Sequence, residues 1–353
     1  MFSLFKINDP YRLIAIVLIA LAIKLPFIIG GCSFPEMQYW LLAGEAAGST
    51  SMYRGLLEST APRAAGVYAT IVLVAGKSIT ALHILGMLLL VLQAIIFNTL
   101  TIRYKVYEQN TYLPAFVFVI IGSIQYELSV FSPTQMGMTF ILLAFSGLLS
   151  HVEFRAKRDE QIMSIGLLVG LAALFHLPLI LFLPIILLIL VIFTNTLSRR
   201  YAILIISAAM PMAVALAYYW VLHGETSYFI SHFLQPVFAL GMRWQALSSS
   251  ALFLYFPLLV LYLAGFLTMP QQRRLNNYQN RLAQLFFITS LLILSIPLLT
   301  RIDLNSSVLL YLPVLSFIAT HLFYLVRRPL SDLMLSILFL GSILFMAYQS
   351  EFM

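Results

Sequence analysis

Residues 162–196, IMSIGLLVGLAALFHLPLILFLPIILLILVIFTNT, contain no Asp, Glu, Lys or Arg, and this stretch decides the fold of the chain. A helix needs about 20 apolar residues to cross the hydrocarbon core of a bilayer, so the stretch is too long for one crossing. Pro178 and Pro184 lie near its middle. Proline lacks the backbone N–H and its ring clashes with the preceding turn, so these residues break the helix. The stretch therefore predicts two membrane-spanning helices joined as a hairpin.

Short basic clusters separate this hairpin from the other apolar runs of the chain. Membrane proteins carry an excess of Lys and Arg in their cytoplasmic loops. Under this rule Lys6 and Arg12 place the N-terminus in the cytoplasm. The clusters that mark the same side are Arg103/Lys105, Arg155/Lys157/Arg158, Arg199/Arg200, Arg273/Arg274/Arg281 and Arg327/Arg328.

With these clusters as fixed points, the apolar runs predict an all-α, polytopic transmembrane protein with about ten or eleven spanning helices. We expect a single membrane domain over residues 1–353. Its first external loop is residues 31–79, with interfacial amphipathic helices, and its second is residues 223–250. The predicted spans are residues 12–30, 80–102, 111–129, 137–151, two within 162–196, 201–222, 251–269, 282–300, 306–326 and 332–348.

Composition supports the membrane assignment. Of the 353 residues, 61% are hydrophobic and 9% are charged, and the mean hydropathy is +0.98. A soluble domain carries about 25% charged residues. The net charge of +7 would suit a nucleic-acid ligand, but the basic residues lie in short clusters between apolar runs. The pattern therefore predicts that the protein lies in a lipid bilayer and that it does not bind nucleic acid.

The chemistry-bearing motifs of common enzyme classes are missing from the sequence. Its six histidines lack metal-ligand spacing, and no HExxH, GxxxxGK[ST], GxGxxG or GxSxG motif is present. We therefore predict no metal and no cofactor.

The N-terminus allows a second interpretation. Lys6 and Arg12, an apolar run and the single cysteine, Cys32, resemble a lipoprotein signal with cleavage before the cysteine. Lys24 and Pro26 interrupt the apolar region, which favours a spanning helix that ends near Cys32.

Polar residues concentrate in the two predicted external loops, which is where function is expected in a membrane protein. Residues 34–45, FPEMQYWLLAGE, have the pattern of a short amphipathic helix with Pro35 in its first turn and an aromatic pair for the interface. Residues 64–76 form a second amphipathic stretch, which we place along the interface. The charged or histidine side chains of these loops that we single out are Glu36, Glu58, Arg63, His232 and Arg243.

The order of these features resembles the integral-membrane glycosyltransferases of the GT-C fold, in particular the branch of protein mannosyltransferases and aminoarabinose transferases. The resemblance covers about residues 1–200. The chain also resembles uncharacterised multi-spanning membrane proteins of Bacteroidota. The residues that carry the resemblance are Glu36 with Tyr39 and Trp40, Met52-Tyr53-Arg54, Ala61-Pro62 with Tyr68, Ala75-Gly76-Lys77-Ser78, Ser132-Pro133, and Gly166 to Ala173 before the hairpin.

The resemblance implies a bacterial inner-membrane enzyme that takes a sugar from a polyprenyl-phosphate donor. It implies Glu36 as the catalytic acid or base, and Arg63, Glu58, His176, His232 and Arg243 as residues near the substrate or its lipid phosphate. Four of them also have an ordinary interpretation. Glu36 suits a helix N-terminus, Glu58 and Arg63 suit a surface ion pair, and His176 suits a structural role.

Two departures from the family keep three functions open. Pro35-Glu36 stands where an aspartate is usual, and Ser132-Pro133-Thr134-Gln135 has no acid where many members carry one. A glycosyltransferase, a non-catalytic subunit or scaffold of an envelope complex, and a transporter or lipid flippase all remain. Against the transporter or flippase, the sequence shows no internal repeat and no pair of broken helices in matching halves, which are features of transporters.

Overall fold

The computed structural model describes residues 5, 9–29, 41, 62–76, 78–124, 131–154, 159–194, 197–223, 259–265, 267, 276–299 and 304–352. The regular secondary structure of these residues is helical, which confirms the all-α prediction. The helices are α2 (Arg12–Ile29), α4 (Pro62–Ala75), α5 (Ile79–Arg103), α6 (Leu113–Ile124), α8 (Pro133–Phe154), α9 (Asp159–Phe175), the 3-10 helix η1 (Leu177–Leu181), α10 (Phe182–Thr194), α11 (Ser198–His223), α15 (Asn277–Leu299), α16 (Leu304–Leu325) and α17 (Arg328–Phe352).

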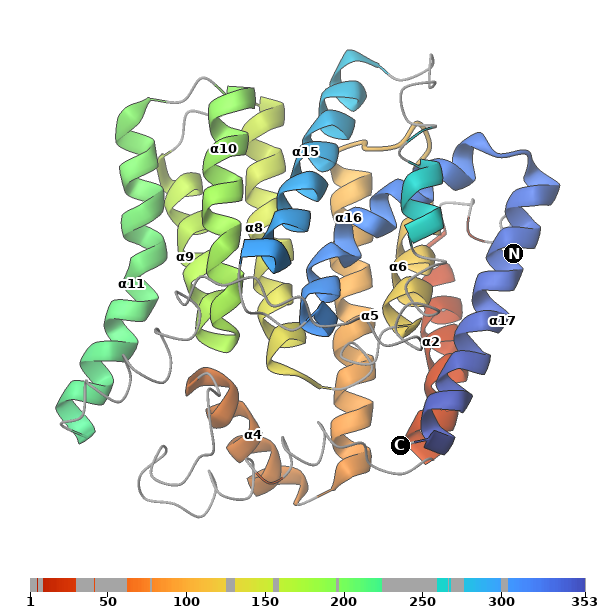
Figure 1. Ribbon diagram of the computed structural model, residues 1–353, viewed down its shortest axis with the longest axis horizontal. Helices are drawn as coiled ribbons and strands as arrows, with labels where there is room; N and C mark the ends of the chain where they lie inside the picture. The colour runs from red at the N-terminus through yellow and green to blue at the C-terminus, as the bar shows by residue number, and fades with distance from the viewer. Residues whose placement is uncertain are drawn as a thin grey trace.

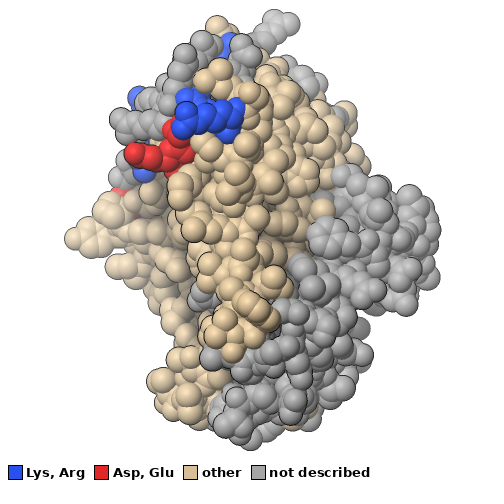
Figure 2. Space-filling model, turned by 90° about the vertical axis from the view of Figure 1, so that its left-hand side faces the viewer, with Lys and Arg blue, Asp and Glu red and all other residues tan. Residues whose placement is uncertain are grey.

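The long helices stand side by side as a bundle, and α4 lies across one end of it (Figure 1). We call this end the α4 end. The opposite end, which we call the basic end, is where α5 finishes and where α11 and α17 begin (Figure 1). On the face drawn in Figure 2, the charged side chains of the described residues gather toward this end. The basic end therefore brings together Arg103, Lys105, Arg199, Arg200 and Arg327. The side of the membrane that it faces stays a prediction.

The structure contains the helical hairpin predicted in residues 162–196, and the crossing of the membrane by its two helices stays a prediction. Its helices are α9 and α10, and η1 forms the turn between them. Pro178 lies within η1 and Pro184 in the first turn of α10, where a missing N–H removes no helical hydrogen bond. The prolines thus set the position of the turn, as the sequence predicts.

Several helices begin earlier than the hydropathy pattern predicts, and capping explains two of them. We expected spans over residues 137–151 and 282–300, whereas α8 begins at Pro133 and α15 at Asn277. In α8 the Ser132 hydroxyl accepts the Gln135 backbone N–H at 3.1 Å. In α15 the Gln279 side chain accepts the Asn276 backbone N–H at 3.2 Å. Both are helix-capping hydrogen bonds, so polar residues that suggest a loop form the first helical turn instead.

Close backbone contact joins α9 to α11. Gly166 and Gly170 lie one turn apart on α9. A Cβ atom at Gly166 would lie 2.5 Å from the carbonyl oxygen of Leu204, and one at Gly170 would lie 2.3 Å from that of Ala208. Small residues at this spacing let helices approach closely within a membrane, where packing rather than water exclusion drives association. The hairpin is therefore held against α11 by its glycines.

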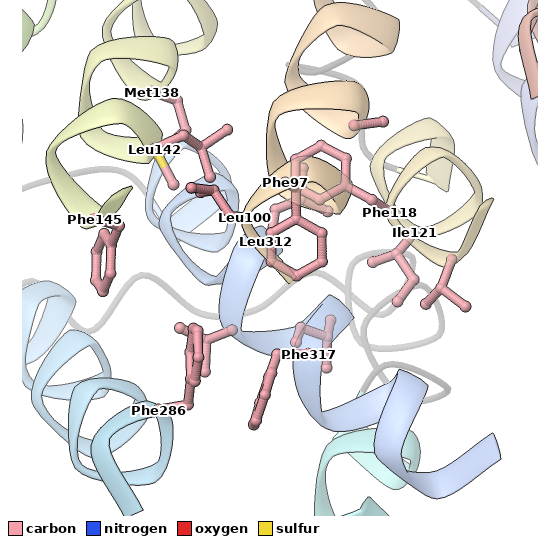
Figure 3. Close-up of a cluster of buried hydrophobic side chains, with 14 of the residues drawn as sticks. Phe97, Leu100, Phe118, Ile121, Met138, Leu142, Phe145, Phe286, Leu312 and Phe317 are labelled. Carbon is pink, nitrogen blue, oxygen red and sulfur yellow. The ribbon is translucent and has the colours of Figure 1, made fainter. Parts of the chain in front are cut away.

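Aromatic side chains fill the centre of the bundle (Figure 3). Phe97 of α5 and Phe118 of α6 have ring centroids 5.2 Å apart, and Phe286 of α15 stacks on Phe317 of α16 at 3.9 Å. Phe145 of α8 lies on the other side of Phe286, at 6.5 Å. The cavity that Phe97, Phe145 and Phe286 help to line holds about 20 Å³, enough for one water molecule. This region packs five helices together and leaves no room for a substrate.

Three of the described helices are long and apolar enough to cross a membrane: α5, residues 133–151 of α8 and residues 198–218 of α11. On α11, Ile206, Val214 and Trp220 are at least 60% exposed. Large apolar side chains on an outer surface suit contact with lipid. The protein is an integral membrane protein, and the number of about ten or eleven spans stays a prediction.

Candidate functional site at the α4 end

Helix α4 corresponds to the amphipathic stretch predicted at residues 64–76, and it has one attached face and one free face. Ala64 and Tyr68 are fully buried, in a cluster with Phe131, Ala173 and Leu177. Leu73 and Val74 are 76% and 83% exposed. The cluster joins α4 to the segment before α8 and to the turn between α9 and η1. The helix is thus fastened over the bundle by the face that carries Ala64 and Tyr68.

Tyr68 makes the polar attachment of α4. Its hydroxyl donates a hydrogen bond to the backbone carbonyl of Phe131. The two rings meet edge to face, with centroids 6.0 Å apart. Phe131 directly precedes Ser132, the capping residue of α8. The position of α4 is therefore tied to the first turn of α8.

Below this contact, amide side chains join α5 to α8. Gln93 of α5 donates from Nε2 to the Gln135 carbonyl oxygen at 2.7 Å and to the Thr139 hydroxyl at 3.0 Å. Gln135 donates from its own Nε2 to the carbonyl oxygen of Gly86 at 3.0 Å. Both glutamines are fully buried. Buried polar groups in a membrane protein need such partners, because lipid offers none.

This network gives a physical reason for the glutamine at position 135, near which many members of the resembling family carry an acid. The side chain faces a backbone carbonyl, which requires a donor. An ionised carboxylate has acceptors only. Gln135 is therefore a structural residue that holds α8 against α5.

His176 lies at the tip of the hairpin, between α9 and η1. Its backbone N–H donates to the Ala172 carbonyl and its carbonyl accepts the Leu179 N–H, both at 3.0 Å. Its Nε2 atom is buried and has no hydrogen-bond partner among the described residues. Burial lowers the pKa of His176 to about 4, because the charged imidazolium loses solvation. The ring is thus neutral at pH 7, with one nitrogen left for a partner.

The structure places two of the six predicted site residues. His176 and the backbone of Arg63, the second residue of α4, lie at the same end of the bundle, since α4 packs against α9. Glu36, Glu58, His232 and Arg243 lie outside the described residues, as does the predicted helix at residues 34–45 except for Leu41. Their predicted roles stay predictions.

Sequence reasoning overlooked the groups that build this end. Gln93 and Thr139 were not singled out, and Tyr68 was noted only as part of the resemblance. A signal was present for Gln93, because an amide inside the apolar run 80–102 is costly unless it is bonded. Nothing in the sequence indicated that its partners are 42 and 46 residues away.

The sequence matches no protein-family model and no curated protein. The structure resembles several solved structures. ArnT from Cupriavidus metallidurans bound to undecaprenyl phosphate superposes with a TM-score of 0.64 at 13% identity, over 91% of this chain and 62% of that one. The oligosaccharyltransferase of Archaeoglobus fulgidus tethered to an acceptor peptide gives a TM-score of 0.60 at 11% identity, over 97% and 55%. The same enzyme in its apo form gives 0.60 at 12% identity, over 97% and 56%.

The chain has the GT-C fold. The fold predicted from the resemblance is thereby confirmed. The chain spans less than two thirds of the length of each of these solved structures. At 11–13% identity the likeness concerns the fold alone.

Proposed function

We propose that this protein is a membrane glycosyltransferase that takes a sugar from a polyprenyl-phosphate donor at its α4 end. The observation that carries the proposal is the GT-C fold shared with an ArnT structure that holds undecaprenyl phosphate. The attachment of α4 over the hairpin tip supports it, because such a donor needs its phosphate at an interface while its chain stays in lipid.

In the proposed reaction, Glu36 takes the proton of the acceptor hydroxyl. The acceptor oxygen then bonds to the anomeric carbon of the sugar. The bond from that carbon to the phosphate oxygen breaks, and polyprenyl phosphate leaves with the electron pair. Groups that bind the leaving phosphate stabilise the charge that develops on it.

In this proposal the phosphate is bound by Arg63, His176, His232 and Arg243. Glu58 orients the side chain of Arg63. Of these, His176 has the buried, unpartnered nitrogen described above. A neutral imidazole can donate one N–H to a phosphate oxygen. The anion would also raise the pKa of the ring, because an opposite charge favours the imidazolium.

A second candidate function is a non-catalytic subunit or scaffold of an envelope complex. The observation that favours it is the structural role of Gln135, which leaves the first turn of α8 with an amide in place of an acid. A scaffold keeps the fold without the chemistry of the α4 end.

The substitution Glu36→Gln separates the two functions. It keeps the size of the side chain and removes the base, so formation of the glycosidic product from a polyprenyl-phosphate sugar in detergent should fall by about 10²- to 10⁴-fold. Glu36→Asp should retain more activity than Glu36→Gln. Glu108→Gln is the matched control, because Glu108 is exposed after α5 at the basic end.

Two outcomes would contradict the proposal that the protein is an enzyme. Equal, full function of the wild type and Glu36→Gln would favour the scaffold. Activity confined to sealed vesicles, without a new glycosidic bond, would favour a flippase.

A further inference from the structure

A cavity of about 200 Å³ lies at the basic end, far from the α4 end. It is formed between the start of α2, the residue before α6 and the last turns of α5. The α5 residues are spaced so that they share one face of the helix. The lining residues are Leu13, Ile95, Asn98, Thr99, Ile102, Arg103 and Tyr112.

The cavity wall contains groups that can donate hydrogen bonds. Asn98 is 2% exposed, and its Oδ1 accepts the backbone N–H of Ala115 at 3.4 Å. This bond turns the acceptor of the amide toward α6, and its Nδ2 makes no hydrogen bond within the described part of the chain. Arg103 is exposed, and no described acid forms an ion pair with it. Arg103, Asn98 and the Tyr112 hydroxyl are thus available as donors to a ligand.

The electrostatics of the cavity favour an anion. Its described lining includes one cation, Arg103, and no acid. Helix α6 begins beside it at Leu113, and a helix N-terminus carries partial positive charge. The start of α2 at Arg12 adds less, because the Asp9 carboxylate accepts the Tyr11 backbone N–H there at 3.1 Å. The C-terminus of α5, which carries partial negative charge, also lies beside the cavity, and Arg103 is in its last turn. The Nε atom of Arg12 is also buried and without a hydrogen-bond partner in the described part of the chain.

Below the cavity, the surface of α2 and α5 is apolar. Leu18 and Leu21 of α2 are 61% and 42% exposed, and Leu88 and Leu92 of α5 are 51% and 47% exposed. The two helices pack against each other. A ligand with acyl chains could therefore place its chains along these helices while its head group reaches Arg103.

We propose that this cavity binds the phosphate of an anionic phospholipid head group. Arginine binds phosphate with two parallel hydrogen bonds, and basic cavities between membrane helices bind anionic head groups. Free inorganic phosphate shares the phosphate chemistry but lacks the acyl chains that the apolar surface would contact. The site is separate from the proposed donor site, which lies at the opposite end of the bundle.

The test uses the full-length protein in a neutral detergent, titrated with phosphatidylglycerol, phosphatidylcholine or inorganic phosphate. Thermal unfolding reports binding, because a ligand of the folded state raises the midpoint, and native mass spectrometry counts retained lipid. Phosphatidylglycerol should raise the midpoint and be retained more than the other two. Arg103→Gln should weaken its apparent affinity about tenfold, the usual effect of losing a charged hydrogen bond.

Two further variants make the result specific. Arg327→Gln removes an exposed cation from the same end and should change the affinity less than about twofold. Thr99→Phe fills the cavity without a change of charge, and it should also weaken lipid binding. Thr99 is exposed, so this variant should fold.

Three results would overturn the proposal. Equal losses in Arg103→Gln and Arg327→Gln would mean that lipid responds to the general charge of the basic end. Equal stabilisation by phosphatidylglycerol and phosphatidylcholine would exclude recognition of the head-group charge. Stabilisation by inorganic phosphate as strong as that by lipid would identify a free phosphate as the ligand.

Discussion

Helix α5 is tied to a neighbour near each end by the same kind of hydrogen bond. At the α4 end, Gln135 of α8 donates its side-chain amide to the carbonyl oxygen of Gly86 at 3.0 Å. At the basic end, Gln279 of α15 donates its amide to the carbonyl oxygen of Lys105, just after α5, at 3.1 Å. Gln135 is fully buried, whereas the Gln279 bond is exposed.

The comparison shows that the surroundings, more than the bond, decide what each end tolerates. An exposed group that loses a hydrogen bond can turn to water, and a buried one cannot. The same holds for charge. Asp159, at the basic end, pairs with Arg200 at 2.9 Å and is itself 41% exposed. The basic end therefore accommodates charged side chains, while the described core of the α4 end relies on neutral amides and hydroxyls.

The largest difference is expected when each glutamine becomes a glutamate. Gln135→Glu replaces a buried donor by acceptors that face a carbonyl, so the free energy of unfolding should fall by about 3 kcal/mol. Gln279→Glu should lower it by less than about 0.5 kcal/mol. Unfolding in mixed detergent micelles measures both. Gln135→Met, of similar volume and without charge, should lie between them, and equal losses at the two ends would refute the contrast.

A smaller effect is expected from His176 as the pH falls. Its pKa is about 4 in the folded protein and about 6.5 in an unfolded chain. Between pH 6.5 and pH 4 the unfolded state takes up the proton first, so stability falls with pH, by about 2 kcal/mol at most for this partly exposed residue. The variant His176→Gln has no group at this position that takes up a proton, so this contribution to the pH dependence should be absent from it.

The measurement is the melting temperature of the wild type and His176→Gln at several pH values. The difference between the two curves isolates the histidine, because all other titrating groups are common to both proteins. A difference that stays constant from pH 7 to pH 4 would show that His176 is protonated as readily in the folded protein as in water.

The smallest effect is expected at the basic end. Asp159→Asn removes the ion pairs with Arg200 and with Arg199, whose side chain is 80% exposed. The Arg200 side chain is only 9% exposed, so its pair with Asp159 is partly shielded from solvent, and the loss should be about 1 kcal/mol. High salt should reduce the difference between variant and wild type, because it screens the exposed pair with Arg199. A loss that persists at 1 M salt would show that Asp159 acts through its hydrogen bond to Arg200.

The helices were largely predictable, and their first turns were less so. Hydropathy places α2, α5 and α11 within a few residues of their observed ends. It misses the first turns of α8 and α15, because Ser132 and Asn276 are polar residues that serve equally well in a loop or as a helix cap.

The candidate site was predictable only in part. The sequence alone brings attention to His176, since it stands beside a proline at the hairpin turn. The bond from Tyr68 to Phe131 joins residues 63 apart, and that from Gln135 to Gly86 joins residues 49 apart. No local sequence pattern predicts contacts between residues so far apart in the chain.

The sequence by itself determined the class of this protein, the position of its apolar helices and the clustering of its basic residues. These follow from the transfer free energy of each side chain between water and lipid, which is a property of residues taken one at a time. The tertiary structure decided which polar groups meet, that Gln135 must donate rather than ionise, and that Leu13 and Tyr112 complete a cavity beside Arg103. Those properties depend on distances between residues far apart in the chain, and only the packing of the helices sets them.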